Sequence, residues 1–314
     1  MKTALRIDKV KAVTAVVRGA SNLVFGQAGL ATGHAEFRDA ELPTRSGALP
    51  FRIYTPPSDP EGVIVFYHGG GWIAGGLETH HDLAGRICAA SGCTVVFVRY
   101  RLAPEHPYPA QIEDAEDALD WVLAQQRVGV FTGPVAVAGD SAGAYQAVMA
   151  AQAVNARTPG AVVGQLLLYP LIGIDPERWA EPRRSPSRQV GRMAVRHINE
   201  ALGAQGVSVA DLCDRIDGNL PFTMILNSRR DPTWPDSERF AKALESAGVE
   251  VELRDRLIWP HGSLSYANRS RRLAGVVQDV ASDFGARLAV SGAEQVNGRD
   301  TFANAEHNKQ EKQC

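Results

Sequence analysis

The sequence predicts an α/β domain built around a mostly parallel β-sheet. Short apolar runs alternate along the chain with stretches of helical composition, which is the pattern of buried parallel strands joined by helical crossovers. The runs lie at residues 63–67, 94–98, 135–138, 165–169, 222–226 and 249–253. With 314 residues, of which 45% are hydrophobic, the chain is long enough to bury one large core.

The N-terminal segment is expected to be helical and is not expected to be a targeting signal. An apolar stretch at Ala12–Val17 is bracketed by Arg6, Lys9, Lys11 and Arg18. Charges this close leave no room for the hydrophobic region of a secretory signal. The stretch is therefore expected to form an amphipathic helix.

The run Val63–Tyr67 leads directly into the glycine-rich loop His68-Gly69-Gly70-Gly71-Trp72. Consecutive glycines lose much conformational entropy on folding, so they indicate a close backbone approach or a positive φ. We expect the backbone N–H groups of Gly69 and Gly70, joined by that of Ala142, to form an oxyanion hole. A phosphate-binding loop is the alternative, but the spacing matches neither G-x-G-x-x-G nor G-x-x-x-x-G-K-[ST]. His68 is expected to orient the loop by hydrogen bonding.

A G-x-S-x-G motif occupies Gly139–Gly143, between an apolar strand at Val135–Ala138 and an expected helix at Ala142–Ala153. A strand that becomes a helix within about four residues forces a tight turn, which small flanking residues permit. Ser141 is therefore predicted to be a nucleophile at the tip of that turn. The alternative is a chance match in a chain with 30 glycines, which the flanking strand and helix disfavour.

Three segments together resemble the bacterial hormone-sensitive-lipase family of α/β-hydrolases. They are H-G-G-G-W at 68–72, Y-R-L-A-P-E-H-P-Y-P at 100–109 and G-D-S-A-G at 139–143, and the matches lie in order over about residues 50 to 285. The resemblance implies the α/β-hydrolase fold, an eight-stranded, mostly parallel sheet flanked by helices. It also implies a small helical cap and a Ser, Asp, His triad in that chain order.

The triad order predicts that each partner of Ser141 lies just past the end of a later strand. Asp231 follows the run 222–226 and precedes a proline, as in the family's D-P. His261 follows the run 249–253 and precedes a glycine, as in the family's H-G. His261 would act as general base and then as acid, and Asp231 would hold its ring in the correct tautomer.

Both assignments have alternatives. Asp231 could cap a helix expected at Ser237–Ala247, with Asp236 taking its place in the triad. His261 could be a loop histidine that faces solvent. The residues next to these positions also depart from the family, since Ser263 and Leu264 stand where an aromatic residue is usual.

Four bulky or acidic residues beside the motifs are expected to line the substrate pocket. They are Trp72, Asp140, Trp234 and Leu264. No metal site and no cofactor are expected, because the predicted acyl transfer needs neither.

The expected organisation is a core interrupted by a cap. Residues 1–45 would supply N-terminal cap helices and the first strand region, 46–170 and 216–290 the two parts of the core, and 171–215 the cap segment. The cap is rich in arginine, and Arg188, Arg192 and Arg196 would share one helix face. A solvated cap surface or a site for an acidic or oxygen-rich substrate would explain them. The polar tail 291–314 is expected to be disordered.

The function predicted from these motifs is that of a serine carboxylesterase acting on a small-molecule ester. The chain also resembles the EstX-type hydrolases carried in integrons, and that resemblance implies a bulky ester or lactone such as a macrolide as one candidate substrate. An amidase or formamidase with the same machinery is the alternative within enzymes. A non-catalytic small-molecule receptor on this fold is the alternative from a different class.

Composition excludes several other classes. The net charge of −2 argues against nucleic acid as a partner, and no apolar stretch reaches the 18 residues of a membrane span. The four cysteines match no disulfide or zinc spacing, so free thiols in the cytoplasm are expected. A homodimer through the edge of the eighth strand, which is common in the resembled family, is left open.

Overall fold

The computed structural model describes the backbone of residues 2–25, 35–175, 186–203, 209–256, 258 and 260–311. Side chains are described within 8–23, 35–175, 191–203, 209–256, 258 and 260–291. Three of the arginines of the predicted cap, Arg178, Arg183 and Arg184, lie outside the described residues, and the side chain of Arg188 does as well.

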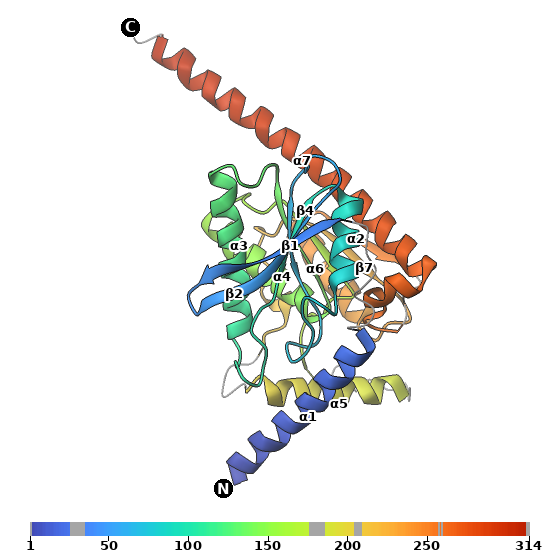
Figure 1. Ribbon diagram of the computed structural model, residues 1–314. Helices are drawn as coiled ribbons and strands as arrows, with labels where there is room; N and C mark the ends of the chain where they lie inside the picture. Colours follow the sequence, from blue (N-terminus) through green and yellow to red (C-terminus); the bar gives the residue numbers. More distant parts are fainter. Residues whose placement is uncertain are drawn as a thin grey trace.

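Within the described residues, one eight-stranded sheet forms the centre of the molecule, with strand order β1-β2-β4-β3-β5-β6-β7-β8 (Figure 1). β1 (Glu36–Thr44) pairs with β2 (Gly47–Thr55), and β2 with β4, in antiparallel register. All later pairs are parallel. The predicted fold class, a mostly parallel sheet of the α/β-hydrolase type, is confirmed.

Six strands match the apolar runs of the sequence to within two residues at each end. They are β3 (Val63–Tyr67), β4 (Thr94–Val98), β5 (Val135–Asp140), β6 (Gly164–Leu168), β7 (Phe222–Asn227) and β8 (Val251–Asp255). The first four of these are buried along their whole length, as expected of strands covered on both faces.

Helices cover both faces of the sheet, and the sheet divides the core into two layers. Alternate residues of β3 enter different layers, with Val65 in one and Phe66 in the other, because side chains alternate along a strand. One layer packs under α3 (Ala110–Arg127), α4 (Ala142–Arg157) and α6 (Trp234–Ser246). The other packs under α2 (His81–Ser91) and α7 (Arg271–Glu311).

Two helices, α1 (Lys2–Phe25) and α5 (Pro186–Ala201), contact each other and lie across one end of the sheet (Figure 1). The Thr14 hydroxyl and the His197 Nε2 are 3.0 Å apart and join the two helices. Arg18 ties α1 to the core by donating hydrogen bonds to the carbonyl oxygens of Ile73 and Ala103, at 2.6 and 2.7 Å. These contacts hold α1, which is helical as expected, over this end of the core, while most of its described apolar side chains stay exposed. The role of the two helices as a cap stays a prediction.

The C-terminal helix α7 continues to Glu311, which covers most of the tail that the sequence analysis expects to be disordered. Side chains beyond residue 291 lie outside the description. The disorder of that tail stays a prediction.

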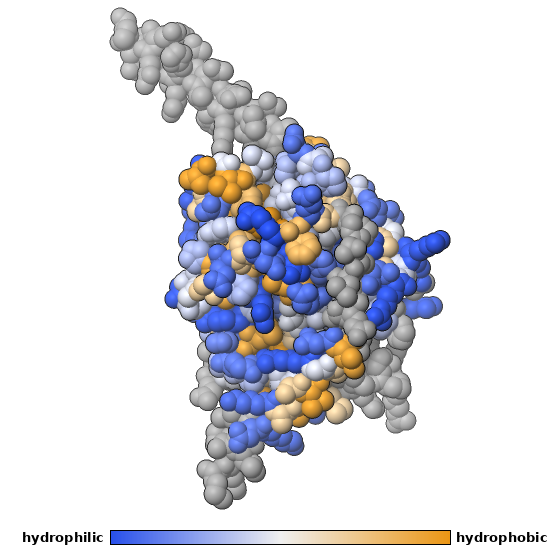
Figure 2. Space-filling model, viewed as in Figure 1, coloured by the Kyte–Doolittle hydropathy of each residue, from blue (hydrophilic) through white to orange (hydrophobic). Residues whose placement is uncertain are grey.

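The face turned to the reader in Figure 2 is mostly hydrophilic, with small groups of apolar side chains. Large apolar side chains that are exposed include Val128 and Val130 after α3, and Val16 and Leu23 on α1. None of the described helices combines the length and the hydropathy that crossing a bilayer would need.

The cysteines within the described residues are free thiols. Cys88 and Cys93 are buried and Cys213 is half-buried. Burial raises the pKa of Cys88 to about 12 and that of Cys93 to about 11, so both are thiols at neutral pH.

Candidate active site

Ser141 lies at a sharp turn between the end of β5 and the start of α4. Its backbone has φ 52° and ψ −116°, a region that residues with a side chain rarely adopt. The surrounding chain holds this conformation, since the Ser141 N–H donates to the Leu168 carbonyl at 2.9 Å and its own carbonyl accepts from Leu171 N–H at 3.1 Å. The turn therefore presents the hydroxyl away from the sheet.

The two glycines of the motif are required by packing. A Cβ on Gly139 would lie 2.4 Å from the Gly143 carbonyl oxygen, and one on Gly143 would lie 2.0 Å from that of Tyr67. Both distances are far below van der Waals contact. Helix α4 thus starts directly against β5 and β3, which only glycine allows at these positions.

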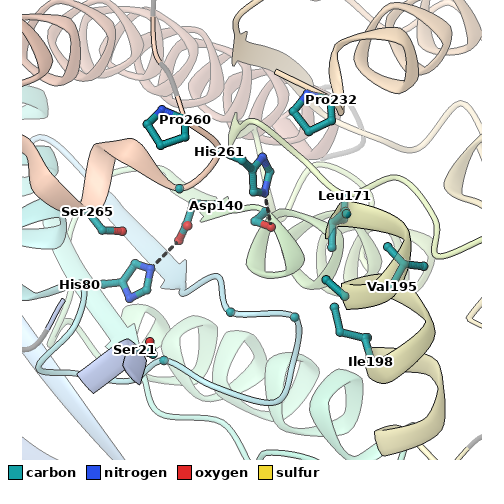
Figure 3. A pocket seen from close by; sticks show the side chains of 17 residues that line it. Ser21, His80, Asp140, Leu171, Val195, Ile198, Pro232, Pro260, His261 and Ser265 are labelled. Atoms are coloured by element: carbon teal, nitrogen blue, oxygen red, sulfur yellow. Dashed lines mark hydrogen bonds and ion pairs between the residues drawn. The ribbon is translucent and has the colours of Figure 1, made fainter. Parts of the chain in front are cut away.

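The structure brings Ser141, His261 and Asp231 together at the ends of three strands. The Ser141 Oγ lies 2.9 Å from His261 Nε2 (Figure 3). On the other side of the ring, His261 Nδ1 lies 2.9 and 3.0 Å from the two carboxylate oxygens of Asp231. A carboxylate only accepts hydrogen bonds, so Nδ1 carries the proton. Nε2 is then free to accept a hydrogen bond from the serine hydroxyl.

Asp231 is buried and held in place by Thr233, whose backbone N–H and hydroxyl donate to its Oδ1 at 2.9 and 2.8 Å. Burial alone would raise the pKa of Asp231, but the charge and hydrogen bond of His261 and the two Thr233 donors outweigh it and lower that pKa. The N-cap of α6 is Thr233, and Asp236 pairs with Arg239. Of the two aspartates weighed from the sequence, the geometry therefore places Asp231 on the histidine.

His261 is partly open to solvent, with 29% of its side chain exposed. Burial opposes the charged ring, but the charge and hydrogen bond of Asp231, and the charge of Asp140, raise its pKa above the ordinary value. The ring of Tyr169 packs edge-on against the imidazole, with centroids 5.0 Å apart. The imidazole therefore has a fixed orientation and an increased basicity, as a general base requires.

The glycine-rich loop lies beside Ser141, and the structure corrects one of its predicted roles. The Gly69 N–H donates to Asp140 Oδ1 at 2.7 Å, so it is not available to a substrate oxygen. Gly70 and Gly71 line the cavity together with Ser141, and no described group accepts a hydrogen bond from their N–H groups. The Ala142 N–H, at the first position of α4, has no preceding intrahelical acceptor.

A cavity of about 490 Å³ opens over Ser141 and His261. One wall is apolar and includes Leu171 and two residues of α5, Val195 and Ile198, whereas the opposite wall carries His80 and Ser265 (Figure 3). Ser21 of α1 also lines it, so both cap helices close the cavity.

Of the four predicted pocket residues, Asp140 lines the cavity and the three apolar ones do not. Trp72 is buried in the core, with its ring perpendicular to that of Tyr145 at 5.4 Å. Leu264, in the 3-10 helix η4 (Ser263–Arg269), is buried in the layer under α2 and α7. Trp234 is the first residue of α6 and is 9% exposed. Nearness in sequence to a motif was a poor guide, because these side chains turn into the core.

Sequence reasoning missed His80, which lies on the cavity wall and is 6% exposed. It also missed Val195 and Ile198 on α5, since the cap carries no family pattern. The only available signal for His80 was its position shortly after the glycine-rich loop. The described residues contain no cluster of three or more His, Cys, Asp or Glu side chains that could hold a metal ion.

Comparisons with known proteins agree with this architecture. A family model for the alpha/beta hydrolase fold matches residues 64–265. Esterase LipI of Mycobacterium tuberculosis is 36% identical over 253 residues, which are 74% of this chain and 77% of that protein. Carboxylesterase NlhH of the same species is 37% identical over 237 residues, covering 70% and 72%. The crystal structure of an esterase from Pyrobaculum calidifontis has a TM-score of 0.73 at 29% identity and covers 88% of this chain and 93% of its own.

Proposed function

Because the chain belongs to the α/β-hydrolase-fold family, and within it to the hormone-sensitive-lipase group, we propose that it hydrolyses carboxylic esters through an acyl-enzyme on Ser141. That it is a carboxylic ester hydrolase follows from its named esterase relatives. The observation that carries the proposed mechanism is the hydrogen-bonded chain from the Ser141 hydroxyl through His261 to Asp231. A receptor without turnover would have no use for this chain of bonds.

In the first half-reaction, the Ser141 Oγ attacks the ester carbonyl while its proton passes to His261 Nε2. The imidazolium that forms is stabilised by the Asp231 carboxylate. The carbonyl oxygen becomes negative and accepts hydrogen bonds from the N–H groups of Gly70, Gly71 and Ala142. Each such donor is worth about 3 to 4 kcal/mol of barrier.

Collapse of the tetrahedral intermediate breaks the bond to the alcohol, which leaves with the proton from His261. A water molecule then gives its proton to the same Nε2 and attacks the acyl carbonyl. The second collapse releases the carboxylic acid and returns the proton to Ser141. No other group is required to store a proton in either step.

The cavity favours an ester with a short acyl chain. Its volume of about 490 Å³ is in the lower part of the range of about 300 to 1,000 Å³ that small-molecule sites occupy. Leu171, Val195 and Ile198 offer an apolar wall close to Ser141. The bulky ester or macrolide lactone implied by the EstX-type resemblance is the competing substrate. The amide bond of an anilide or formamide is the competing bond for cleavage.

The test is a hydrolysis screen read by mass spectrometry. It spans p-nitrophenyl acetate to caprylate, matched anilides and macrolide lactones, with Ser141→Ala as the inactive variant. Ser246→Ala, on the exposed end of α6, is the matched control and should hydrolyse at the wild-type rate. We expect the highest kcat/KM on short acyl esters and a loss of about four to six orders of magnitude in Ser141→Ala.

Retained turnover by a folded Ser141→Ala variant would overturn the proposed mechanism. A gain of one water by a macrolide, at a higher kcat/KM than any short ester, would replace the proposed substrate. Faster cleavage of anilides than of esters would replace the proposed bond.

A further inference from the structure

A second histidine–aspartate pair, His80 and Asp140, faces the cavity and has no part in the proton transfers above. The His80 Nε2 lies 3.3 Å from Asp140 Oδ1 (Figure 3). Asp140 is the last residue of β5, directly before Ser141, and is only 2% exposed. A buried charge is costly unless it is paired and hydrogen-bonded. The contacts of this carboxylate therefore indicate its role in the site.

Asp140 holds one end of the glycine-rich loop. Its Oδ1 accepts the Gly69 N–H at 2.7 Å, in addition to facing His80. Its other oxygen packs against the same residue so closely that a Cβ on Gly69 would lie 2.4 Å from Oδ2. A hydrogen bond to an ionised acceptor is about twice as strong as one between neutral groups. The contact thus joins β5, which leads into Ser141, to the glycine-rich loop beside the cavity.

The carbonyl side of Gly69 is fixed as well. A carbonyl only accepts, so the His68 Nδ1, 2.7 Å away, donates to it. His68 is itself buried, with its ring stacked on that of Tyr100 at 4.2 Å. Both polar groups of Gly69 therefore have a buried partner, one on each side of its Cα.

The N–H groups of the next two residues have no described acceptor, although the Gly70 carbonyl accepts hydrogen bonds from the N–H groups of Ile73 and Ala74 at 3.2 and 3.0 Å. Gly70 and Gly71 have φ values of 113° and 62° and line the cavity, whereas Gly69 does not. A run of glycines has the greatest conformational freedom of any sequence, so the direction of these two N–H groups depends on how the chain before them is held. The anchor at Gly69 supplies that constraint on the N-terminal side, and the hydrogen bonds to the Gly70 carbonyl supply it on the C-terminal side.

His80 is arranged to support the carboxylate. Its second ring nitrogen, Nδ1, lies 2.8 Å from the Thr79 hydroxyl, so both nitrogens are engaged. Burial alone would raise the pKa of Asp140, but the charge and hydrogen bond of His80 and the hydrogen bond from the Gly69 N–H together lower it. Asp140 is therefore a carboxylate at neutral pH.

We propose that Asp140, supported by His80, is a positioning residue for the oxyanion hole, which anchors Gly69 so that the N–H groups of Gly70 and Gly71 face the reacting carbonyl oxygen. The inference rests on the proposed acyl transfer to Ser141. It assigns Asp140 a role different from lining the pocket, which is what the sequence suggested.

The experiment compares Asp140→Ala, Asp140→Asn and His80→Gln in the full-length protein. The matched control is Asp114→Asn, which removes a buried carboxylate that is paired with Arg101 and does not line the cavity. For each variant, kcat and KM are measured on p-nitrophenyl butyrate. Inhibition is measured with a trifluoromethyl ketone, which forms a tetrahedral adduct on Ser141, and with the matching methyl ketone, which binds as a ground-state analogue.

We expect Asp140→Ala to lower kcat about 100-fold, because misplaced oxyanion donors cost about as much as lost ones, with KM changed by less than about threefold. The trifluoromethyl ketone should lose affinity by a similar factor, and the methyl ketone by little. Asp140→Asn retains an acceptor for Gly69 and should recover part of the loss, to about tenfold below wild type. Asp114→Asn should leave the ratio of the two affinities unchanged.

An Asp140→Ala variant that hydrolyses at the wild-type rate would overturn the proposal, as would equal losses of affinity for both ketones. Should Asp140→Ala not fold, Asp140→Asn decides in the same way, since an unchanged affinity ratio in that variant contradicts the role. The proposed function is contradicted by a different result, an active Ser141→Ala variant. That result does not depend on Asp140, so failure of the proposed function and failure of this inference can be told apart.

Discussion

Two histidine–aspartate pairs lie beside one cavity, and they differ in exposure and in whether the hydroxyl on the second ring nitrogen lines that cavity. In the pair His261 and Asp231, only Nδ1 is held by the carboxylate, and Nε2 faces the Ser141 hydroxyl at 2.9 Å. In the pair His80 and Asp140, Nε2 faces the carboxylate and Nδ1 faces the Thr79 hydroxyl. His261 has 29% of its side chain exposed, whereas His80 has 7%.

Pairing with a carboxylate therefore does not by itself decide what a histidine can do, because the group on its second ring nitrogen and its exposure decide it. A ring whose second nitrogen meets a hydroxyl that lines the cavity, as His261 does, can take and return a proton there. A ring whose second nitrogen meets a buried hydroxyl outside that cavity, as His80 does, fixes the groups around it. The same two residue types thus give a proposed base on one side of Ser141 and a proposed support on the other.

The largest expected difference between the pairs comes from replacing each histidine with glutamine. His261→Gln removes the only base in the proposed mechanism, so we expect kcat to fall by about five to six orders of magnitude. His80→Gln keeps a donor toward Asp140 and should cost about tenfold. Steady-state kinetics on p-nitrophenyl butyrate measure kcat for both variants. Similar losses of kcat in the two would contradict the different roles proposed for His261 and His80.

Replacing each aspartate with asparagine gives the next largest difference. Asp231→Asn removes the acceptor that fixes the Nδ1–H tautomer of His261, and we expect a loss of about 10⁴ in kcat. Asp140→Asn is expected to cost only about tenfold. Both variants should unfold at temperatures near that of the wild type, which circular dichroism checks. An Asp231→Asn variant that is less impaired than Asp140→Asn would reverse the assignment of roles.

The pH dependence of kcat/KM reports on both pairs. The base must be neutral, so kcat/KM should rise with pH through the pKa of His261, by up to about tenfold per pH unit below it. That pKa is raised, so the midpoint should lie above the ordinary imidazole value of about 6.5.

The charge of Asp140 contributes to raising the pKa of His261, so Asp140→Asn should move the midpoint of kcat/KM toward lower pH. Stopped assays from pH 5 to 9 measure both profiles. A flat wild-type profile, or a midpoint that moves upward in the variant, would contradict the electrostatics described for the site.

The smallest expected effects concern the threonine that supports each pair. Thr233→Val removes the hydroxyl that donates to Asp231 at 2.8 Å, and a lost hydrogen bond to a charged group should lower kcat about tenfold. Thr79→Val removes the partner of His80 Nδ1 and should lower kcat by less than about threefold. The isosteric change keeps the packing, so thermal unfolding serves as the control. A larger effect at Thr79 than at Thr233 would argue against the ranking of the pairs.

Much of the fold could be predicted from the sequence because its signals are local. The apolar runs that form β3 to β6 are buried on both faces, which gives each a continuous hydrophobic signature. The positions of Ser141, Asp231 and His261 followed from motifs and from the rule that such residues lie past strand ends. Their catalytic roles stay predictions until variants are measured.

The wrong predictions concern residues whose orientation is decided by contacts with residues distant in the sequence. Which N–H groups of the glycine-rich loop are available depends on Asp140, 71 residues further along, and that contact removes Gly69 from the oxyanion hole. Trp72 and Leu264 were expected in the pocket for their bulk, yet both turn into the core. The same limit hid the cap residues Val195 and Ile198, since nothing local shows which helix face meets a cavity.

Covalent labelling with a p-nitrophenyl alkylphosphonate, followed by peptide mass spectrometry, shows whether Ser141 is a nucleophile that His261 activates. The reagent mimics an ester and traps the nucleophile as a stable adduct. We predict one adduct per chain, on the peptide that contains Ser141, formed rapidly in the wild type and very slowly in His261→Gln. An adduct on another residue, or labelling of Ser141 at the same rate without His261, would contradict it.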